Sequence, residues 1–384
     1  MNYKKVVIIH FGELWLKGRN RPNFIRQLYK NIENALGGSD YNEFESWRDR
    51  FVIYLNEKSD ADFILKKLGY VFGISWFSIA YLTDSNIENM MNTVNSLLSN
   101  YDPEISYKIE AHRTDKSLAF NSYQIVSAFI KQDKIKVSKD SSHIIYINPT
   151  NKGTFIYFGD EINKGLGGFP VGVSGKAIIL FSGGIDSPVA AYYAMKKGLE
   201  PIYVHVHSFD DNKKAEKSKI PELINQLSNF NNGSKAYYIP SSIFQISILK
   251  VKHSFEIILF KRFIYSIGEM IAKKEKADVI VTGESLGQVS SQTVSNLIST
   301  SYKIKNEFVM RPLIAFDKSE IIKKAKEIGT FDISIKPYKD VCSMHSRDAI
   351  TNSSNAKLDE LSKLIEMDDI VIRSLLKSDS LSYD

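Results

Sequence analysis

The residues best suited to chemistry form a short motif, SGGIDS at residues 182–187, directly after an apolar run. That run, AIILF at residues 177–181, is typical of a buried strand, and Pro188 opens a helical stretch behind the motif. Two glycines let the backbone turn sharply and approach a ligand closely. Backbone amides at such a turn and at a helix N-terminus favour an anion, and two serine hydroxyls add donors. The motif therefore predicts a phosphate-binding turn between a strand and a helix.

The motif also carries one acid, Asp186. A carboxylate beside phosphates is repulsive unless a cation lies between them, so Asp186 indicates Mg²⁺ bridging to phosphates, bound partly through water. The alternative is that Asp186 caps the helix, and it could do both. No lysine follows the glycines, so the GxxxxGK[ST] phosphate loop is excluded. A tight turn with incidental glycines is the alternative for the motif as a whole.

The second candidate for chemistry is Cys342, the single cysteine of the chain. One cysteine excludes an intrachain disulfide and a cysteine-rich zinc or iron–sulfur site. Nucleophilic or persulfide chemistry requires the thiolate, and Lys339 and His345 are placed in the sequence to lower the thiol pKa. The alternative is an inert cysteine that packs as a small hydrophobe.

The first half of the chain alternates short strands with helices, a pattern typical of α+β sheets covered on one face. The expected strands are Lys4–Ile9, Arg50–Leu55, Ile74–Leu82, Ser106–His112, His143–Asn148 and Thr154–Phe158. The expected helices are Pro22–Ala35, Ala61–Leu68, Ile87–Leu98 and Gln124–Lys131.

A glycine-rich join, GLGGFPVGVSGK at residues 165–176, follows and cannot form regular secondary structure. Behind it, near-continuous apolar strands alternate with helical stretches, which predicts a parallel sheet with helices on both faces. The expected strands are Ala177–Phe181, Ile202–His207, Ala236–Ile239 and Asp278–Thr282. In such a sheet, ligands bind outside the carboxyl ends of the strands, where the SGGIDS motif falls.

Composition and charge narrow the class of protein further. No run of some eighteen apolar residues exists, and the four-residue apolar run near the start is too short for a secretory signal. We therefore expect a cytoplasmic protein with no membrane partner. Residues 1–30 hold seven Lys or Arg against one acid, Glu13, which suits a polyanion partner. An unevenly charged solvated surface is the alternative.

The SGGIDS motif resembles the pyrophosphate loop (PP-loop) of ATP pyrophosphatases that adenylate a substrate. Co-occurrence with further stretches makes the chain similar to the tRNA 4-thiouridine synthetases over residues 1 to about 345. Longer family members carry a rhodanese domain with a second cysteine, so the resemblance is to a short form without it. The stretches that carry it are HFGELWLKGRNRPNF (10–24), YKIEAHRTDKSL (107–118), GGFPVGVSGK (167–176), TGESLGQVSSQT (282–293), RPL (311–313), KSEIIKKAKEIG (318–329) and FDISIKPYKDVC (331–342).

This resemblance implies a multidomain α/β and α+β fold. Its domains are a ferredoxin-like domain at residues 1–58, a THUMP RNA-binding domain at 59–164, a linker at 165–176 and a PP-loop ATP pyrophosphatase domain, similar to adenine-nucleotide alpha-hydrolases, at 177–384. The last forty residues match nothing that assigns them a role.

The resemblance also implies site residues. Asp186 and Cys342 are the expected catalytic residues. The positions that match the ATP site are Ile179, Leu180, Ser182, Gly183, Gly184, Asp186, Ser187, Val204, His205, Lys261, Arg262, Gly283 and Gln292. Many relatives have arginine at the position of Lys261, so either Lys261 or Arg262 is the nucleotide contact, and His205 is alternatively a core histidine. The expected tRNA contacts are Lys17, Arg19, Arg21, His112, Arg113 and Lys116.

The implied reaction uses ATP and Mg²⁺ to adenylate the C4 oxygen of uridine 8 in tRNA, after which a sulfur nucleophile displaces AMP. Sulfur must come from outside the chain, from a cysteine desulfurase, a rhodanese-type persulfide carrier or sulfide. Homodimers occur in the family, although the sequence does not fix the oligomeric state. Two other functions stay open: a PP-loop enzyme that modifies another tRNA base, and a non-catalytic tRNA-binding protein.

Overall fold

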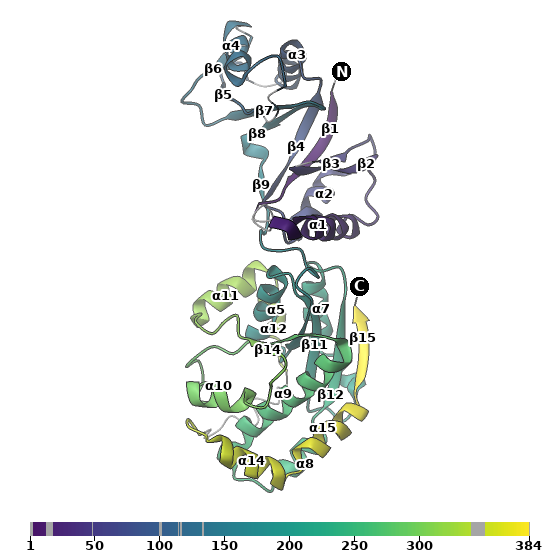
Figure 1. Cartoon of the computed structure of the whole chain (residues 1–384), viewed down its shortest axis with the longest axis vertical. Helices are drawn as coiled ribbons and strands as arrows, with labels where there is room; N and C mark the ends of the chain where they lie inside the picture. The colour runs from purple at the N-terminus through teal and green to yellow at the C-terminus, as the bar shows by residue number, and fades with distance from the viewer. Residues whose placement is uncertain are drawn as a thin grey trace. The chain divides into compact units, whose positions relative to one another are not determined.

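The computed structural model of the chain describes residues 3–12, 18–47, 49–99, 102–113, 115, 117–132, 134–338 and 350–383. The chain divides into two compact units, Met1–Gly168 and Phe169–Asp384, called here the N-terminal and C-terminal units (Figure 1). The division falls inside the predicted linker, at a stretch where the structure has no helix.

The N-terminal unit is built on one sheet, which in the described residues has nine strands in the order β2-β3-β1-β4-β8-β7-β5-β6, with β9 pairing β4. The strands are β1 (Lys4–His10), β2 (Glu43–Ser46), β3 (Arg50–Tyr54), β4 (Trp76–Thr83), β5 (Ser106–Ala111), β6 (Lys136–Val137), β7 (Ile144–Thr150), β8 (Gly153–Phe158) and β9 (Asn163–Lys164). The helices are α1 (Arg21–Ala35), α2 (Ala61–Leu68), α3 (Ile87–Leu97) and α4 (Ser122–Gln132). The predicted elements of this half are therefore present, with β2, β6 and β9 in addition.

Alternating side chains give this sheet two different faces. Ile156 of β8 packs with Met90 and Val94 of α3 and with Ile125 and Phe129 of α4. Its neighbours Phe155 and Tyr157 point the other way, into a cluster made of strand residues. Period-two alternation of this kind places helices on one face, as expected for α+β architecture.

The predicted boundary between residues 58 and 59 falls within this sheet. β4 lies beyond the boundary, yet it pairs antiparallel with β1 from Lys4↔Leu82 to His10↔Trp76. The sheet therefore continues from one predicted domain into the next, and the division at residue 58 stays a prediction.

The C-terminal unit has a six-stranded sheet in the described residues, ordered β14-β13-β10-β11-β12-β15. Its strands are β10 (Lys176–Leu180), β11 (Glu200–His207), β12 (Ser234–Pro240), β13 (Val279–Val281), β14 (Phe308–Met310) and β15 (Asp379–Tyr383). The strands β10 to β14 are parallel, and β15 pairs antiparallel with β12. The chain runs from β10 outward to β12 and then returns to place β13 on the other side of β10, so the strand order reverses between β10 and β13.

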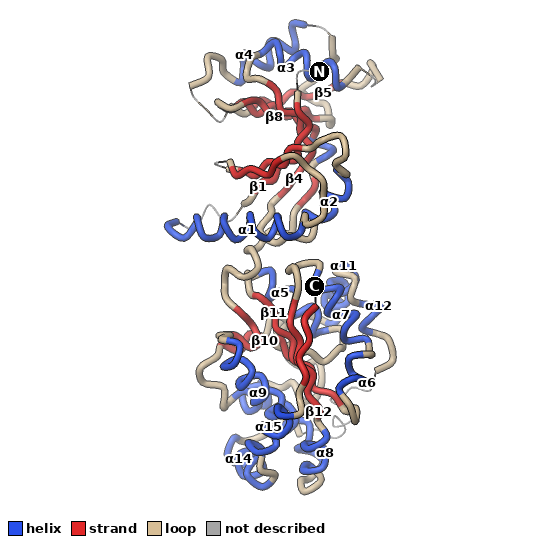
Figure 2. Tube along the Cα trace, turned by 90° about the vertical axis from the view of Figure 1, so that its right-hand side faces the viewer, coloured by secondary structure: helices blue, strands red, loops and turns tan. Residues whose placement is uncertain are grey.

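Helices cover both faces of this sheet, as predicted. They are α5 (Asp186–Lys196), α6 (Asn212–Glu216), α7 (Lys219–Ser228), α8 (Ser242–Ile248), α9 (Glu256–Glu275), α10 (Val294–Ser301), α11 (Lys318–Glu327), α12 (Phe331–Ser334), α14 (Asn355–Leu364) and α15 (Met367–Leu376). Figure 2 shows α9 and α15 on one side of the sheet and α7, α11 and α12 on the other. None of the helices in the described ranges is long and apolar enough to cross a membrane.

The last forty residues, for which the sequence assigned no role, complete this unit. Leu358 and Leu361 of α14 and Ile370 and Val371 of α15 are buried in the main core together with residues of α9. β15 then covers the edge of β12, where the hydroxyls of Tyr238 and Tyr383 are 2.5 Å apart. This segment is therefore an integral part of the unit's core and sheet.

Candidate functional site

The SGGIDS motif forms the turn between β10 and α5, as predicted. Gly183 has φ +79°, and a Cβ at this position would clash with Ile220 of α7, so glycine is required twice over. A Cβ on Gly283 would lie 2.9 Å from the backbone of Asp186 and Ser187. Gly283 in the turn after β13 thus packs against Asp186 and Ser187, which follow β10. This contact lies at the point where the strand order reverses. Open α/β sheets bind ligands at such a point.

A cavity of about 630 Å³ opens beside these two turns, a volume suited to a nucleotide-sized ligand. One part of its wall is apolar and contains Val206 of β11 with Ile257, Phe260 and Ile264 of α9. The predicted ATP-site residues that line it are Leu180, Ser182, Asp186, Ser187, Val204, Lys261, Gly283 and Gln292. Ile179, Gly183, Gly184, His205 and Arg262 were predicted with them and do not line it.

Asp186 is the first residue of α5, and the preceding Ile185 occupies the N-cap position. Asp186 therefore lies one residue inside the helix, in its first turn, and not at the N-cap position of the capping alternative. One carboxylate oxygen lies 2.5 Å from Nζ of Lys318, and the other accepts from Nε2 of Gln288 at 2.9 Å. The only acid of the motif is thus directed toward the turn after β13 and the start of α11.

Lys318 and Gln288 are functional candidates that the sequence analysis missed as individual residues. Both lie in stretches that support the family resemblance, but neither had been given a role. Lys318 opens α11 behind a capping box formed by Asp317 and Glu320, which fixes the helix start. Its ammonium group is therefore held beside Asp186 by regular structure.

A buried ion cluster forms another part of the cavity wall. Glu284, in the turn after β13, accepts from Lys261 of α9 at 2.9 Å and from Arg311 at 3.0 Å. Burial by itself would raise the pKa of Glu284, but the charges of Lys261 and Arg311 together with the hydrogen bonds lower it to about 2. The carboxylate is therefore ionised at neutral pH and balances part of the charge of two cations.

The structure separates Lys261 from Arg262, which the sequence could not. Arg262 is buried and faces away from the cavity, donating to the Ser299 carbonyl at 2.9 Å and to Asp359 of α14 at 2.6 Å. Its third partner is Asn355 at 3.3 Å. The geometry therefore favours Lys261 over Arg262 as the nucleotide contact, because the Arg262 guanidinium joins α9 to α10 and α14.

We expect Arg262→Met to lower the free energy of unfolding by about 2 kcal/mol, because buried partners lose charge-assisted hydrogen bonds. In a unit of this size that corresponds to a fall in Tm of roughly 4–8 °C. ATP affinity should stay unchanged. The matched variant Lys261→Met should weaken ATP binding, and it should also lower Tm because Glu284 loses a buried partner. Thermal unfolding and equilibrium ATP binding on both variants decide, and weaker ATP binding in Arg262→Met at unchanged Tm would contradict the assignment.

His205 of β11 proves to be a core histidine. It is 1% exposed, and its Nδ1 lies 2.7 Å from the Phe181 carbonyl while Nε2 lies 2.6 Å from the Tyr338 hydroxyl. Since a carbonyl can only accept, Nδ1 carries the proton and Nε2 accepts from Tyr338. Burial lowers the pKa of His205 to about 3, so the ring is neutral at physiological pH. Its predicted contact with nucleotide gains no support from this geometry.

The predicted sulfur residue, Cys342, lies outside the described residues, as do Lys339 and His345. The described chain before them ends at Tyr338, whose hydroxyl donates to His205 as above. Lys219 of α7 donates to the carbonyls of Ser334 at 2.5 Å and Lys336 at 3.0 Å. The approach to Cys342 is therefore fixed against β11 and α7, beside the phosphate-binding turn.

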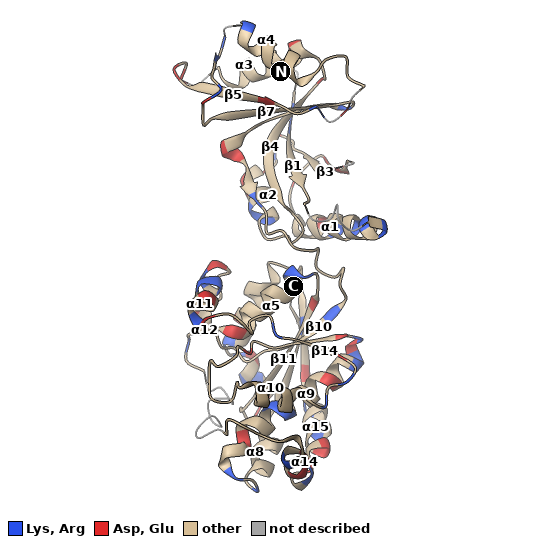
Figure 3. Cartoon of the chain, turned by 60° about the vertical axis from the view of Figure 1, so that its left-hand side comes forward, with Lys and Arg blue, Asp and Glu red and all other residues tan. Residues whose placement is uncertain are grey.

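The predicted tRNA contacts belong to the N-terminal unit. Lys17 and Lys116 lie outside the described residues. Arg19 and His112 are exposed, whereas Arg113 donates to the carbonyls of Leu118 at 3.1 Å and Phe120 at 3.0 Å. Arg113 thus holds its own loop in shape, while Arg19 and His112 are accessible to a ligand. Figure 3 shows the distribution of charged residues over both units.

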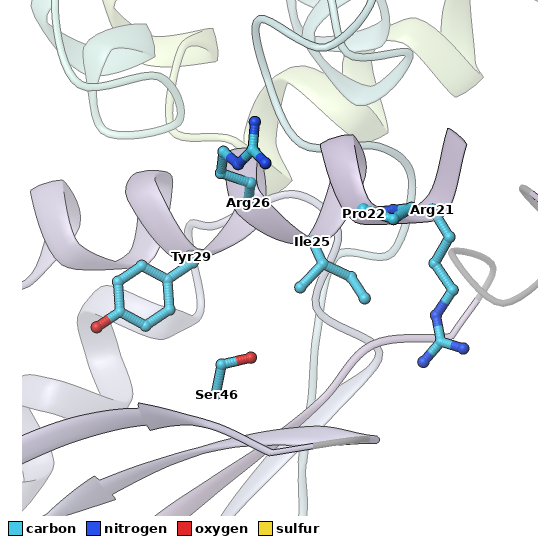
Figure 4. Close-up of a pocket in the computed structure, with 6 residues that line it drawn as sticks. All are labelled: Arg21, Pro22, Ile25, Arg26, Tyr29 and Ser46. Atoms are coloured by element: carbon cyan, nitrogen blue, oxygen red, sulfur yellow. The ribbon is translucent and has the colours of Figure 1, made fainter. Parts of the chain in front are cut away.

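A groove on α1 includes Arg21, another of the predicted tRNA contacts. It has a volume of about 450 Å³ and is lined by Arg21, Pro22, Ile25, Arg26, Tyr29 and Ser46. Figure 4 shows Ile25 and Tyr29 pointing from α1 toward the strand that carries Ser46. Tyr29 also stacks on Phe44 of β2, with ring centroids 4.3 Å apart. Arg26 and Tyr29 were not predicted as functional residues.

Comparison with known proteins identifies the family. The family model described as Thiamine biosynthesis protein (ThiI) matches residues 172–367, which include both turns and the cavity. The chain belongs to the ThiI family. A ThiI ferredoxin-like domain model matches residues 6–78, and the fold class predicted from the sequence is confirmed. The resemblance to the tRNA 4-thiouridine synthetases is therefore confirmed as well.

Individual relatives match this chain over most or nearly all of its length. A probable tRNA sulfurtransferase of Bacillus licheniformis is 36% identical over 351 residues, covering 89% of this chain and 86% of the relative. One of Mycoplasmopsis synoviae is 36% identical over 386 residues, covering 98% and 99%. A crystal structure of a 4-thiouridine synthetase–RNA complex with bound ATP matches with TM-score 0.87 and 29% identity, covering 99% of this chain and all of that one.

Proposed function

We propose that this chain is an ATP-dependent tRNA 4-thiouridine synthetase. It adenylates the C4 oxygen of uridine 8 in tRNA with release of pyrophosphate, and sulfur then displaces AMP. The observation that carries this proposal is the SGGIDS turn, which presents Asp186 to a cavity of about 630 Å³ at the point where the strand order reverses. Family membership and the full-length match to a 4-thiouridine synthetase with bound ATP support it.

The two parts of the cavity wall suit the two ends of ATP. The apolar residues Val206, Phe260 and Ile264 offer a surface for the adenine ring. The turn amides, with Ser182 and Ser187, offer hydrogen-bond donors to phosphate oxygens at the N-terminus of α5. We infer that Leu180, Val204, Lys261, Gly283 and Gln292, which line the same cavity, complete the ATP site.

The uracil C4 oxygen is a poor leaving group, and adenylation converts it into a good one. The C4 oxygen attacks the α-phosphorus of ATP, the bond to the β-phosphate oxygen breaks, and pyrophosphate leaves with its electrons. Negative charge grows on the leaving phosphates, and donors fixed in advance stabilise that charge most effectively. Lys318 opens α11, and its ammonium group lies 2.5 Å from Asp186. It is therefore placed to supply a positive charge that balances the negative charge on the leaving phosphates.

We infer that Mg²⁺ accompanies ATP and reaches the protein through Asp186. The described residues contain no group of three or more His, Cys, Asp or Glu that could hold a metal by themselves. The Asp186 carboxylate on the wall fits Mg²⁺, which commonly binds through one or two carboxylates, substrate phosphates and water. When bound, Mg²⁺ neutralises phosphate charge. Lys318 and Gln288 each donate to one of the two Asp186 oxygens.

We infer that Cys342 acts in the sulfur step. Its sequence position, four residues after Tyr338, supports this, because Tyr338 is anchored beside the phosphate-binding turn. A persulfide on Cys342 would attack C4 with its terminal sulfur as AMP departs, forming a disulfide to the base. An external thiol must then cleave this disulfide, since the chain has one cysteine. With sulfide as donor, HS⁻ displaces AMP with no redox change.

We infer that tRNA contacts the N-terminal unit, with Arg19, Arg21 and His112 among the phosphate contacts. Helical RNA is recognised mainly by shape and phosphate contacts, and the reacting base must leave the stack to reach a cavity. The fold match to a synthetase in complex with RNA supports this assignment. Arg113 serves this surface through its loop, and Lys17 and Lys116 belong to the same proposal from sequence alone.

Two further partners belong to the proposal. The sulfur donor is a cysteine desulfurase, a rhodanese-type persulfide carrier or sulfide. On the persulfide route an external thiol is also needed, because one cysteine cannot both receive and release sulfur by itself. A homodimer would cover the exposed apolar side chains of Val294 and Ile298 on α10 and of Tyr302 directly after it. We expect the protein to work in the cytoplasm, where tRNA is modified.

The direct test is nucleoside analysis of unmodified tRNA after incubation with the protein, MgATP and a sulfide source. We expect 4-thiouridine and one pyrophosphate for each thiolated base. Appearance of a different thiolated nucleoside would show that the enzyme modifies another tRNA base. Tight tRNA binding without pyrophosphate release would make the chain a non-catalytic tRNA-binding protein.

A further inference from the structure

A buried carboxylate in the wall of the ATP cavity has no part in the proposed chemistry. Glu284 follows β13, is 8% exposed and lies among more donors than an ordinary ion pair provides. Burying a charged carboxylate is costly unless it is paired and hydrogen-bonded, so its position calls for an explanation. The two oxygens of this carboxylate have different surroundings, and that difference indicates what it does.

One oxygen, Oε2, is held by a rigid frame. It accepts from the hydroxyl of Tyr265 at 2.8 Å, from Thr282 Oγ1 at 3.2 Å and from Arg311 Nε at 3.0 Å. The frame is itself locked, since Arg311 Nη2 donates to the Tyr265 hydroxyl at 3.0 Å and to the Leu297 carbonyl at 3.1 Å. Oε2 therefore cannot move without breaking several buried hydrogen bonds.

The other oxygen, Oε1, accepts from Nζ of Lys261 at 2.9 Å. Lys261 lines the cavity and its side chain is 13% exposed, so its ammonium group lies at the wall with only slight access to water. A lysine has a long, flexible stem, and a fixed acceptor restricts where its charge can lie. The single charge of Glu284 is shared between Lys261 and Arg311, so the three groups together keep one positive charge.

We propose that Glu284 is a positioning residue, which fixes the Lys261 ammonium group at the cavity wall to meet the phosphates of ATP. This inference rests on the proposed ATP site. It also explains how a lysine can replace an arginine at this position. The planar guanidinium of arginine has a fixed orientation, whereas the ammonium group of Lys261 is oriented by its hydrogen bond to Oε1 of Glu284. The net positive charge of the cluster then faces the polyanionic ligand.

The test is a double-mutant cycle on the KM for ATP in pyrophosphate release, with Glu284→Gln, Lys261→Met and the double variant. Glu284→Gln should raise KM roughly tenfold and leave kcat nearly unchanged, since a ground-state contact is lost. In the Lys261→Met background, Glu284→Gln should have almost no further effect. A purely structural Glu284 would instead weaken both backgrounds equally.

A matched control is Glu269→Gln, which removes a carboxylate paired with Lys273 on the same helix, α9, away from the cavity. It should leave KM unchanged. If Glu284→Gln folds poorly, Glu284→Asp keeps the charge but shortens the reach, and the same cycle applies. Additive effects would overturn the inference. A wild-type protein that neither binds nor cleaves ATP would refute the proposed function instead.

Discussion

Replacing Asp186 with alanine is expected to lower the rate of pyrophosphate release about 10³-fold or more and to abolish 4-thiouridine formation. Asp186 is the only acid of the SGGIDS turn, and its carboxylate faces the cavity where phosphate charge develops. ATP affinity should fall less than the rate, because the variant frees Lys318 to pair with phosphates. Affinity for tRNA should be nearly unchanged. Radiolabelled pyrophosphate release and filter binding of tRNA measure the two effects separately.

The matched control for that experiment is Asp210→Ala. Asp210 forms an ion pair with Lys214, and the side chain of Asp210 is 91% exposed. Removal of this carboxylate should therefore change neither catalysis nor tRNA binding. If Asp186→Ala weakened tRNA binding as much as it slowed pyrophosphate release, the division of labour between the two units would be wrong.

The second large effect is expected from Cys342→Ser. With a persulfide donor, this variant should reduce 4-thiouridine formation at least about 100-fold while pyrophosphate release continues, because a thiolate is needed to accept the persulfide sulfur and pass it on. Adenylation depends on the SGGIDS turn, Asp186 and Lys318, none of which the substitution alters. Nucleoside analysis and pyrophosphate release, measured in one reaction mixture, report the two half-reactions together.

The single cysteine of the chain provides an unusually clean control. Alkylation of wild-type protein with iodoacetamide can modify no other cysteine, so it should reproduce the loss seen in Cys342→Ser. The serine variant should be insensitive to the reagent. Undiminished 4-thiouridine formation by Cys342→Ser with a persulfide donor would remove Cys342 from the mechanism, whereas free sulfide, which displaces AMP directly, should support both proteins.

Local signals predicted the scaffold of the site well. Apolar runs such as AIILF located the buried parallel strands, because burial on both faces requires continuous hydrophobicity. Glycine and proline spacing located the turn before α5. Short or polar strands escaped prediction: β15, with the sequence DSLSY, is a strand only because it pairs with β12. Strand formation in such segments depends on pairing with a neighbouring strand, and their amino-acid composition does not predict that pairing.

The side-chain contacts of the site were less accessible to sequence reasoning. Lys318 meets Asp186 across 132 residues, and no periodicity predicts such a pairing. Lys261 and Arg262 are neighbours on α9, a helix buried on several sides, where hydrophobic pattern does not reveal which face meets the cavity. A rotation of about 100° between adjacent helical residues places one in the ATP site and the other against α14.

The edge strand β15 also has a consequence for synthesis of the protein. Tyr238 on β12 meets Tyr383 across 145 residues of chain. While a ribosome is still making the intervening segment, the amides and carbonyls along that side of β12 have no neighbour, and open edges recruit strands from other chains. Nascent molecules are therefore exposed to mispairing at this edge until residues 379–383 have been made, and a chain that stops before them leaves the β12 edge open to strands of other molecules.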